Sequence, residues 1–307
     1  MKVLLVLSGN SKDGINIIVK NQAETLKRSD LLIEYFRIDG KGFLSYFKHI
    51  LLLRRHLLRQ KYDLFHAHYS FSGIVATIAG CKPLVVSLMG SDTQKNFLWK
   101  SIIRFFSKMF WDITIVKSIS MKQDSGIKKV VVLPNGVDLE SVKPLTRRCF
   151  SENRVVLFAS DPERKSKNFE LARKAMDLMQ DDKISLKVIH SISHKEILQE
   201  INHADLLIVT SLWEGSPNIV KEAMACNCPV VSTKVGDVEW LFGDQPGYFL
   251  TSSDPADVAD KIKEALEFSK VYGKTNGRDR IIELGLDSRT IALKLINLYK
   301  EILEKRI

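Results

Sequence analysis

Residues 205–239 read Asp-Leu-Leu-Ile-Val-Thr-Ser-Leu-Trp-Glu-Gly-Ser-Pro-Asn-Ile-Val-Lys-Glu-Ala-Met-Ala-Cys-Asn-Cys-Pro-Val-Val-Ser-Thr-Lys-Val-Gly-Asp-Val-Glu. The stretch begins with a short apolar run, 206–209, of the length of a buried strand. Ser216 is a favoured N-cap residue, and Pro217 suits the first position of a helix because the N–H that it lacks would be unpaired there anyway. The stretch therefore predicts a strand, a loop and a helix in that order.

Two carboxylates lie close to the start of the predicted helix. Glu214 is in the loop, and Glu222 lies four residues after Asn218, on the helix side that the apolar stripe leaves open. A helix N-terminus favours anions because its unpaired N–H groups and its dipole are positive. Carboxylates beside such a site suit a sugar or ribose that is joined to a phosphate. The alternative is that Glu222 only caps and solubilises an ordinary helix.

The spacing of Glu214 and Glu222, followed by Ala-Met-Ala and a Pro-Val-Val strand, resembles the donor-site signature of glycosyltransferase family 4. In that family the first glutamate contacts the transferred sugar, and the second binds the ribose hydroxyls of the nucleotide. The resemblance therefore implies a catalytic role for Glu214 and donor binding by Glu222. It extends donor binding to neighbouring residues of the motif, which are Gly215, Ser216, Asn218 and Ile219.

The length and composition indicate a protein of about two domains. The chain has 307 residues, and no apolar run reaches the ~20 residues that a membrane-spanning helix needs. Its start leads into a strand without a cleavage site, so we expect a cytoplasmic protein. The four cysteines are too few and too scattered for a disulfide framework or a zinc site, and we expect them to be small buried hydrophobic residues.

The basic residues are concentrated in the first half of the chain. Residues 1–150 contain 24 lysines and arginines against 11 acidic residues, a net charge of +13, whereas residues 151–307 have a net charge of −3. Such asymmetry indicates an anionic partner for the first half. A membrane surface, a phosphorylated acceptor and nucleic acid would each fit.

The first half alternates strand-like apolar runs with helical patterns. Its first strand, 3–7, leads into a loop rich in glycine, serine and asparagine and then into a helix over 15–28. Gly9 and Gly14 of this loop would let the backbone approach a ligand, although they do not form the dinucleotide-binding fingerprint. Further strands are predicted at 32–37, 64–66, 83–88, 113–116 and 130–133. Such alternation predicts a parallel sheet covered by helices.

Polar residues follow several of these strands, at the edge where open α/β sheets bind ligands. They are His66-Ala-His68-Tyr69, Met89-Gly-Ser-Asp92 and Pro134-Asn135-Gly136. All three segments resemble landmarks of family 4, and we take His66, His68 and Asn135, with Gly14, as candidates for the acceptor site or the cleft. The family usually has histidine where this chain has Met89, so Asp92 is the nearest polar candidate for catalysis. The alternative for the histidines is a purely structural place at strand ends.

Residues 139–153 contain Pro144 and show no periodicity, so we interpret them as the linker. The second half of the chain then repeats the alternation of strands and helices. Strands are predicted at 155–159, 186–189, 206–209, 230–232 and 248–250. The resemblance implies the α/β GT-B fold, with two Rossmann-like domains facing each other across a cleft. We expect an acceptor domain at 1–147, a nucleotide-sugar domain at 148–285, and a helix in 286–307 that crosses back to the first domain.

Arg164 and Lys167 lie in the loop after the first strand of the second half. In family 4 a basic pair in this loop neutralises the diphosphate of the donor, and the resemblance implies the same use here. A solvated basic loop is the alternative. The chain has no Asp-x-Asp motif, so we expect no metal and no cofactor besides the nucleotide diphosphate sugar, with UDP as the expected nucleotide.

The expected function is a retaining transfer of a sugar to an acceptor, which we expect to be a lipid-linked or cell-surface glycan precursor. One alternative is a nucleotide-sugar-binding protein without transfer activity, which the substitution at Met89 makes conceivable. Another is a nucleic-acid-binding protein, which only the basic first half suggests, and we expect no such partner.

Two segments with helical patterns, 41–61 and 97–111, join cations to bulky apolar side chains. Four of the six aromatic residues of the second segment are too many to face one sheet easily, and they are Trp99, Phe106, Phe110 and Trp111. Basic amphipathic helices with aromatic borders bind anionic membrane interfaces. We therefore expect the first domain to dock on the inner face of the membrane, and burial in the core is the alternative.

Overall fold

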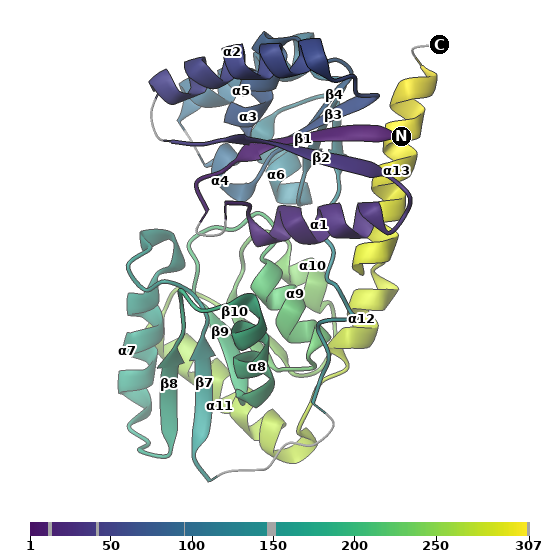
Figure 1. The fold of residues 1–307 in the computed structure, drawn as a ribbon. Coiled ribbons are helices and arrows are strands. Elements are labelled where there is room, and N and C mark those ends of the chain that lie inside the picture. The colour runs from purple at the N-terminus through teal and green to yellow at the C-terminus, as the bar shows by residue number, and fades with distance from the viewer. Residues whose placement is uncertain (12–13, 41–42, 95, 146–151, 306–307) are drawn as a thin grey trace. The chain divides into compact units, whose positions relative to one another are not determined.

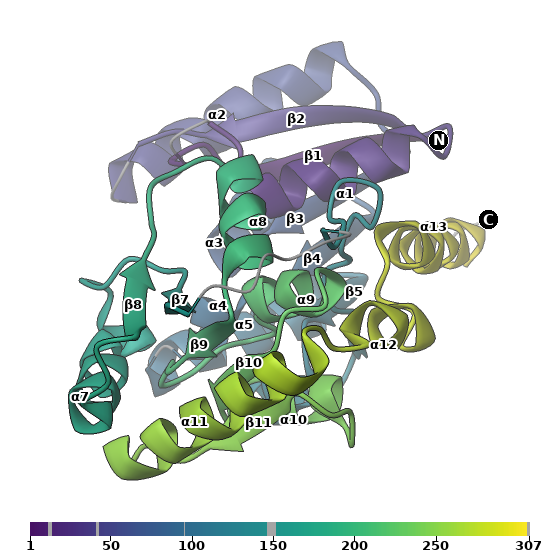
Figure 2. The same ribbon diagram turned by 90° about the horizontal axis from the view of Figure 1, so that it is seen from below.

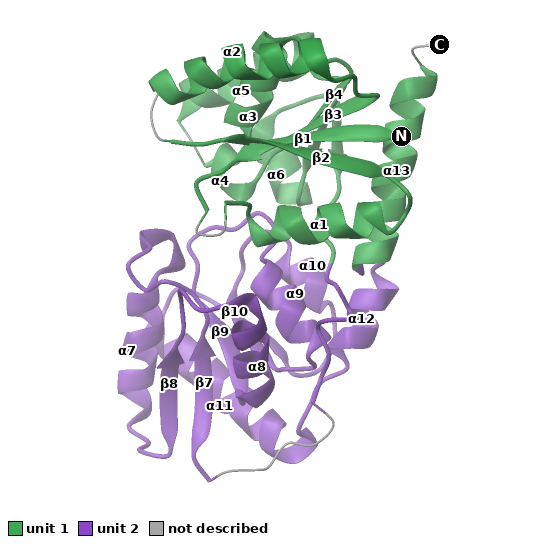
Figure 3. Ribbon diagram, viewed as in Figure 1, with its two compact units in different colours: residues 1–136, 288–307 green, residues 137–287 purple. Residues whose placement is uncertain are grey.

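The computed structural model describes residues 1–11, 14–40, 43–94, 96–145 and 152–305. The chain forms two compact units (Figure 3), of which unit 1 comprises residues 1–136 and 288–307 and unit 2 comprises residues 137–287. The predicted domain boundary between residues 147 and 148 falls outside the described residues and stays a prediction. Each unit contains a parallel β-sheet with helices packed on it, so the predicted α/β class is confirmed.

The sheet of unit 1 has the strand order β2-β1-β3-β4-β5-β6 (Figure 1). Its strands are β1 (Lys2–Ser8), β2 (Leu32–Ile38), β3 (Leu64–His68), β4 (Leu84–Ser87), β5 (Ile113–Val116) and β6 (Val130–Val132). Its helices are α1 (Ile17–Lys27), α2 (Phe43–Arg59), α3 (Ser70–Ala79), α4 (Gly90–Thr93), α5 (Phe97–Met109), α6 (Ile119–Ser125) and α13 (Ser288–Glu304). Each strand lies within two residues of its predicted bounds.

Successive side chains of β3 point to opposite faces of the sheet, so its two histidines lie together on one face. Phe65 and Ala67 point to one face of the sheet, where they share a core with residues of α2, α3 and α5. His66 and His68 point to the other face, with their ring centroids 4.4 Å apart. There the Nδ1 atom of His66 and the hydroxyl of the buried Tyr299 in α13 form a hydrogen bond of 2.6 Å. His66 therefore connects the sheet to the C-terminal helix.

The C-terminal helix α13 packs on unit 1 beside α1 (Figures 1 and 3). Its buried residues recur at helical spacing, and they are Ile291, Ala292, Leu295, Ile296, Tyr299 and Ile302. The chain thus returns to its first unit after completing the second. This confirms the predicted return of the last helix.

The sheet of unit 2 has the strand order β11-β10-β9-β7-β8. Its strands are β7 (Arg154–Phe158), β8 (Ile184–Val188), β9 (Leu206–Val209), β10 (Val230–Thr233) and β11 (Tyr248–Thr251). Its helices are η1, a 3-10 helix (Lys165–Lys167), α7 (Phe169–Met179), α8 (His194–His203), α9 (Asn218–Ala225), α10 (Val238–Phe242), α11 (Pro255–Tyr272) and α12 (Gly277–Glu283). Helices α7 and α11 pack together over β7 and β9 with their apolar faces (Figure 2).

Helix α9 starts one residue later than predicted. Pro217 has an extended conformation and is the N-cap residue, so the first helical residue is Asn218. Ser216 lies before the cap, and its hydroxyl does not cap the helix. The prediction that Ser216 is the N-cap was therefore wrong, because the chain turns into the helix only after the proline.

Three of the six aromatic residues of the second amphipathic segment belong to the core or pack against it. Trp111 is 4% exposed, and Trp99 and Phe106 pack against the same core cluster. The ring of Phe71 in α3 packs at a tilt against Trp99, with centroids 4.2 Å apart, and stacks on Tyr46 of α2 at 5.1 Å. Phe110 is 36% exposed, so the four residues do not all face the core, although the other three are packed in it.

The described cysteines are buried, as predicted. Cys81, Cys226 and Cys228 are free thiols, and Cys149 lies outside the described residues. Burial raises the pKa of Cys81 to about 12. None of the helices in the described part of the chain combines the length and the apolarity that crossing a membrane requires.

Tyr299→Phe should lower the free energy of unfolding by about 1–3 kcal/mol, because Nδ1 of His66 would lose its partner inside the core. Urea denaturation followed by circular dichroism measures the change. Tyr272→Phe is the matched control, since the side chain of Tyr272 is 69% exposed. A Tyr299→Phe variant as stable as the control would contradict a stabilising role for this hydrogen bond.

Candidate functional site

A partly buried ion pair joins the loop between β9 and α9 to η1. The ammonium group of Lys167 in η1 contacts Oε1 of Glu214, which also accepts a hydrogen bond from the Ser211 hydroxyl at 2.9 Å. The side chains of Lys167 and Glu214 are only 17% and 16% exposed. Thr210 donates a hydrogen bond of 3.0 Å to the carbonyl of Lys167, which joins η1 to the end of β9. Two residues that were predicted separately are therefore direct neighbours.

Arg164 has different surroundings from Lys167. Its side chain is exposed, and no ion pair involves it in the described part of the chain. Its carbonyl accepts a hydrogen bond of 2.8 Å from the backbone N–H of Lys167, so it stands just before η1. The guanidinium group can therefore turn toward an anion without breaking an ion pair.

Glu222 projects from α9 toward α8. Its Oε1 atom lies 2.9 Å from Nε2 of His194, the first residue of α8. A capping box formed by Ser193 and Glu196 fixes the start of α8 and thereby places His194. The hydrogen bond to Glu222 raises the pKa of His194 above its ordinary value, against the effect of burial, and the charges of Glu222 and Asp138 add to the rise.

Glycines let two loops of unit 2 approach closely. Gly236, which follows β10, has φ of +59°, and a Cβ atom there would lie 2.7 Å from the carbonyl oxygen of Gly215. Gly215 and Ser216 are buried, whereas Asn218 and Ile219 are half-buried in the first turn of α9. The predicted donor-binding residues therefore lie in one segment that the neighbouring loop supports.

A cavity of about 290 Å³ lies in unit 1 at the ends of β1 and β3. Its lining combines hydroxyl, amide and carboxyl groups with aromatic rings, contributed by Ser8, Asn10, Ser11, Asn16, Tyr46, Tyr69, Phe71, Ser72, Ser91 and Asp92. A cavity with polar groups beside aromatic rings suits a small polar ligand such as a sugar. Asp92 is the one predicted site residue in its lining.

The carboxylate of Asp92 is 1% exposed and holds the loops around this cavity. Its Oδ1 atom accepts hydrogen bonds from the hydroxyl of Ser70 at 2.5 Å and from the backbone N–H of Ser70 at 3.2 Å. Its Oδ2 atom accepts one from the N–H of Met89 at 2.8 Å. These bonds join the start of α3 to the start of α4, so the geometry gives Asp92 a positioning role.

His66 and His68 are buried, and neither belongs to the lining of the cavity. His66 is hydrogen-bonded through both ring nitrogens, to Tyr299 and to the hydroxyl of Ser87 at 2.8 Å. Burial and the charge of Lys117 lower the pKa of His68 to about 3, so its ring is neutral. Neither ring nitrogen of His68 has a hydrogen-bond partner in the described part of the chain. The surroundings of His66 therefore fit the alternative that this histidine has a purely structural place at the end of a strand.

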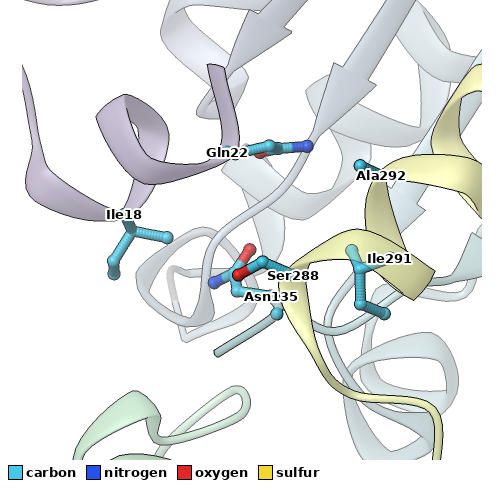
Figure 4. Close-up of a pocket in the computed structure, with 7 residues that line it drawn as sticks. Ile18, Gln22, Asn135, Ser288, Ile291 and Ala292 are labelled. Carbon is cyan, nitrogen blue, oxygen red and sulfur yellow. The ribbon is translucent and has the colours of Figure 1, made fainter. Parts of the chain in front are cut away.

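Gly14 and Asn135 do not line the cavity of about 290 Å³, although the N–H of Gly14 donates a hydrogen bond of 2.9 Å to the carbonyl of Ser11 in its lining. Gly14 has φ of +74°, and a Cβ atom there would meet the guanidinium group of Arg37 at 2.9 Å. Asn135 lines a cavity of about 20 Å³ between α1 and α13, large enough for about one water molecule (Figure 4). Gln22 reaches the same cavity, and its buried Oε1 atom has no hydrogen-bond partner among the described residues.

The sequence analysis missed several residues of these sites. His194, Tyr46 and Phe71 carry no local signal, because helix packing brings them to the sites. Tyr69 belongs to the strand-end motif that begins at His66 but was not taken as a candidate, and in the structure its φ of +74° marks an unusual turn. The described residues contain no group of three or more histidine, cysteine, aspartate or glutamate side chains that could hold a metal ion.

Comparison with protein families gives two matches. The model described as Glycosyltransferase Family 4 matches residues 16–141, and the one described as Glycosyl transferases group 1 matches residues 138–267. TuaC of Bacillus subtilis, a glycosyltransferase named for teichuronic acid biosynthesis, is 27% identical over 235 residues, which are 65% of this chain. The chain spans about 60% of the length of this curated relative.

Solved structures have the same fold. Sucrose-phosphate synthase from Thermosynechococcus elongatus superposes with a TM-score of 0.84 at 17% identity and covers 99% of both chains. HepE from Anabaena, in complex with UDP and glucose, superposes with a TM-score of 0.76 at 17% identity and covers 97% of this chain and 99% of its own. These likenesses confirm the predicted GT-B fold with its two parallel sheets.

The ion pair of His194 and Glu222 should stabilise the protein at low pH. Because the pKa of His194 is higher in the folded than in the unfolded chain, its contribution is fully present below the unfolded value and is lost as the pH rises through the folded value. We expect His194→Gln to cost about 1 kcal/mol at about pH 5.5 and less at about pH 8.5. Urea denaturation at both pH values measures this difference.

His190→Gln is the matched control, since His190 is exposed and contacts the adjacent Ser191. A cost of His194→Gln that does not change with pH would contradict the charged pair.

Proposed function

The chain belongs to glycosyltransferase family 4, and we propose that it transfers a hexosyl group from a nucleotide diphosphate sugar to an acceptor hydroxyl with retention of configuration. The observation that carries this proposal is the cluster of Glu214, Lys167 and Glu222 around the start of α9. Two carboxylates and a cation at a helix N-terminus match the hydroxyl groups and the diphosphate of such a donor.

We expect UDP to be the nucleotide. The related fold of HepE was solved with UDP and with UDP-glucose, which supports UDP-glucose as the first donor to test. We expect no metal or other cofactor, because Lys167, Arg164 and the N-terminus of α9 supply positive charge for the diphosphate.

Donor binding would change the partner of Lys167. In the free protein its ammonium group is paired with Glu214. A bound diphosphate would give Lys167 a second anion and would leave Glu214 oxygens for the sugar hydroxyls, while Glu222 holds the ribose. Exchanging one anionic partner for another avoids leaving a partly buried charge unpaired.

The proposed reaction needs no acid–base pair of glutamates, because both face the donor. The bond between the anomeric carbon and the diphosphate oxygen breaks, and the acceptor oxygen bonds to the anomeric carbon on the same face. The acceptor proton passes to a phosphate oxygen of the leaving nucleotide. Lys167 and Arg164 stabilise the charge that develops on this diphosphate.

The cavity of unit 1 is the proposed acceptor site. Tyr46, Tyr69 and Phe71 offer aromatic surface for a sugar ring, and serine hydroxyls beside them offer hydrogen bonds. Asp92 would position this lining rather than react, because its carboxylate already accepts hydrogen bonds from two backbone N–H groups and a hydroxyl. No histidine stands in the lining as a replacement for the one that the family usually has at Met89.

Binding of a nucleotide sugar without transfer is the competing function, and Met89 is the observation that favours it. The two functions differ in one measurement. A transferase releases UDP from UDP-glucose when cell extract is supplied as acceptor source, whereas a binding protein does not.

A lipid-linked acceptor at a membrane surface is supported by exposed apolar side chains on α2 and α5. They are Leu44, Phe47, Leu51, Leu52 and Leu58 on α2, and Phe97, Leu98, Phe105 and Met109 on α5. Exposed cations accompany them, among which Arg54, Arg55 and Arg59 lie on α2. Apolar side chains beside cations fit an anionic membrane surface, at about 1 kcal/mol per cation.

A second observation supports an anionic partner for unit 1. A cavity of about 320 Å³ lies between the C-terminal half of α5 and the turn before β6. Its lining includes four cations and no acidic residue, and the cations are Arg104, Lys108, Lys128 and Lys129. Such a cavity could accept the phosphate of a lipid headgroup.

Glu222→Ala should weaken UDP binding roughly ten- to a hundredfold, because a charge-assisted hydrogen bond to ribose is lost. Glu214→Ala should reduce turnover of UDP-glucose more than it weakens UDP binding. Lys167→Ala should weaken UDP far more than uridine, because the diphosphate is what it contacts. Titration calorimetry and a UDP-release assay measure these effects.

Glu239→Ala is the matched control for these variants, since Glu239 is 58% exposed and pairs with Lys234. Unchanged UDP binding by a folded Glu222→Ala protein would contradict the assignment of Glu222 to the donor site.

Changing Arg54, Arg55 and Arg59 together to glutamate should abolish binding to vesicles that contain phosphatidylglycerol, because three positive charges are replaced by three negative ones. Co-sedimentation at low and high salt measures binding, and the wild-type protein should bind only anionic vesicles and less at high salt. Lys174, Lys263 and Lys270 of unit 2, changed together to glutamate, form a control with the same charge change. Wild-type protein that stays in the supernatant at low salt would remove the membrane proposal.

A further inference from the structure

Three buried polar side chains gather beside the loop that contains Glu214. Ser216 lies in this loop, Lys221 on α9, and Asp237 in the loop after β10, and their exposed fractions are 9%, 0% and 8%. The contact of Gly236 with the carbonyl of Gly215 brings the two loops together. Ionisable groups are seldom buried to this extent without a specific use.

The buried polar atoms of Asp237 and Ser216 lie near each other but meet no partner at hydrogen-bond geometry among the described residues. These atoms are both carboxylate oxygens of Asp237 and the hydroxyl of Ser216. Asp237 is the N-cap residue of α10, yet its side chain does not cap that helix. An unsatisfied buried polar group is costly, so a native structure usually keeps one for a ligand, a water molecule or a reaction.

Lys221 supplies the charge that opposes Asp237. Burial raises the pKa of Asp237, whereas the ammonium group of Lys221 and the nearby hydroxyl of Ser216 lower it. Burial lowers the pKa of Lys221 to about 8, and the charges of Asp237 and Glu222 oppose this change. The two side chains therefore favour each other's charged forms.

The chemistry of this cluster selects its ligand. A phosphate would be repelled by Asp237, and an apolar group would leave the carboxylate unpaired. A hydroxyl group both donates and accepts hydrogen bonds, so it can donate to the carboxylate and accept from a neighbouring donor. The adjacent Glu214 is the residue proposed to contact the sugar of the donor.

We propose that Ser216 and Asp237 form a subsite for one hydroxyl group of the donor hexose, with Asp237 accepting a hydrogen bond from it. Lys221 is a positioning residue, because it is fully buried and acts through the carboxylate. The inference rests on the proposed function and adds to it a residue that distinguishes one donor sugar from another. A site built to pair a hydroxyl rejects sugars that lack it.

The test compares UDP-glucose with UDP in titration calorimetry of the full chain. Asp237→Asn should weaken UDP-glucose at least tenfold and leave the affinity for UDP unchanged. Monodeoxy analogues of UDP-glucose then identify the hydroxyl. One analogue should bind wild-type protein at least tenfold more weakly than UDP-glucose, and Asp237→Asn should bind that analogue and UDP-glucose equally.

Glu239→Gln is the matched control, because this exposed carboxylate lies two residues away and should affect neither ligand. Ser216→Ala provides a second variant with the same expected selectivity, should Asp237→Asn fail to fold. Equal losses for UDP and UDP-glucose, or unchanged binding of both, would show a structural pair or a water site and overturn the inference. Wild-type protein that binds neither ligand would instead overturn the proposed function together with this subsite.

Discussion

The ion pair between Lys167 and Glu214 is the interaction on which the site of unit 2 depends. It joins the loops that follow β7 and β9, two strands that lie side by side in the sheet. The next strand, β10, brings Gly236 against Gly215 from the other side. Since parallel strands end at the same edge, three loops converge there, and the ion pair fixes two of them in register.

Both units use the same edge of their sheets in different ways. In unit 2, charged groups at the strand ends face one another and leave capacity for a ligand. In unit 1, the carboxylate of Asp92 already accepts hydrogen bonds from the loops. Aromatic side chains line the cavity there. An anionic donor and a neutral sugar acceptor would need this difference, because one is bound by charge and the other by shape and hydrogen bonds.

The sequence predicts the fold well because the strands are buried apolar runs whose length and alternation with helices are local properties. It also predicts Glu214 and Lys167 individually as site residues, since each belongs to a motif, but it does not predict that they form an ion pair. It could not predict His194 as the partner of Glu222, because α8 and α9 meet only in the folded unit. The prediction of Ser216 as the N-cap was wrong for a related reason. The extended conformation of Pro217 decides where the helix starts, and residue spacing does not reveal it.

The hydrogen bond between His66 and Tyr299 spans 233 positions of the chain. Unit 1 is therefore discontinuous, and a ribosome must synthesise all of unit 2 before the last helix can dock. Until then the face of the first sheet that α13 covers stays open to water, and Nδ1 of His66 lacks its partner on α13. Transiently exposed apolar surface is prone to aggregation, so the synthesis of α13 also completes the cover that protects unit 1.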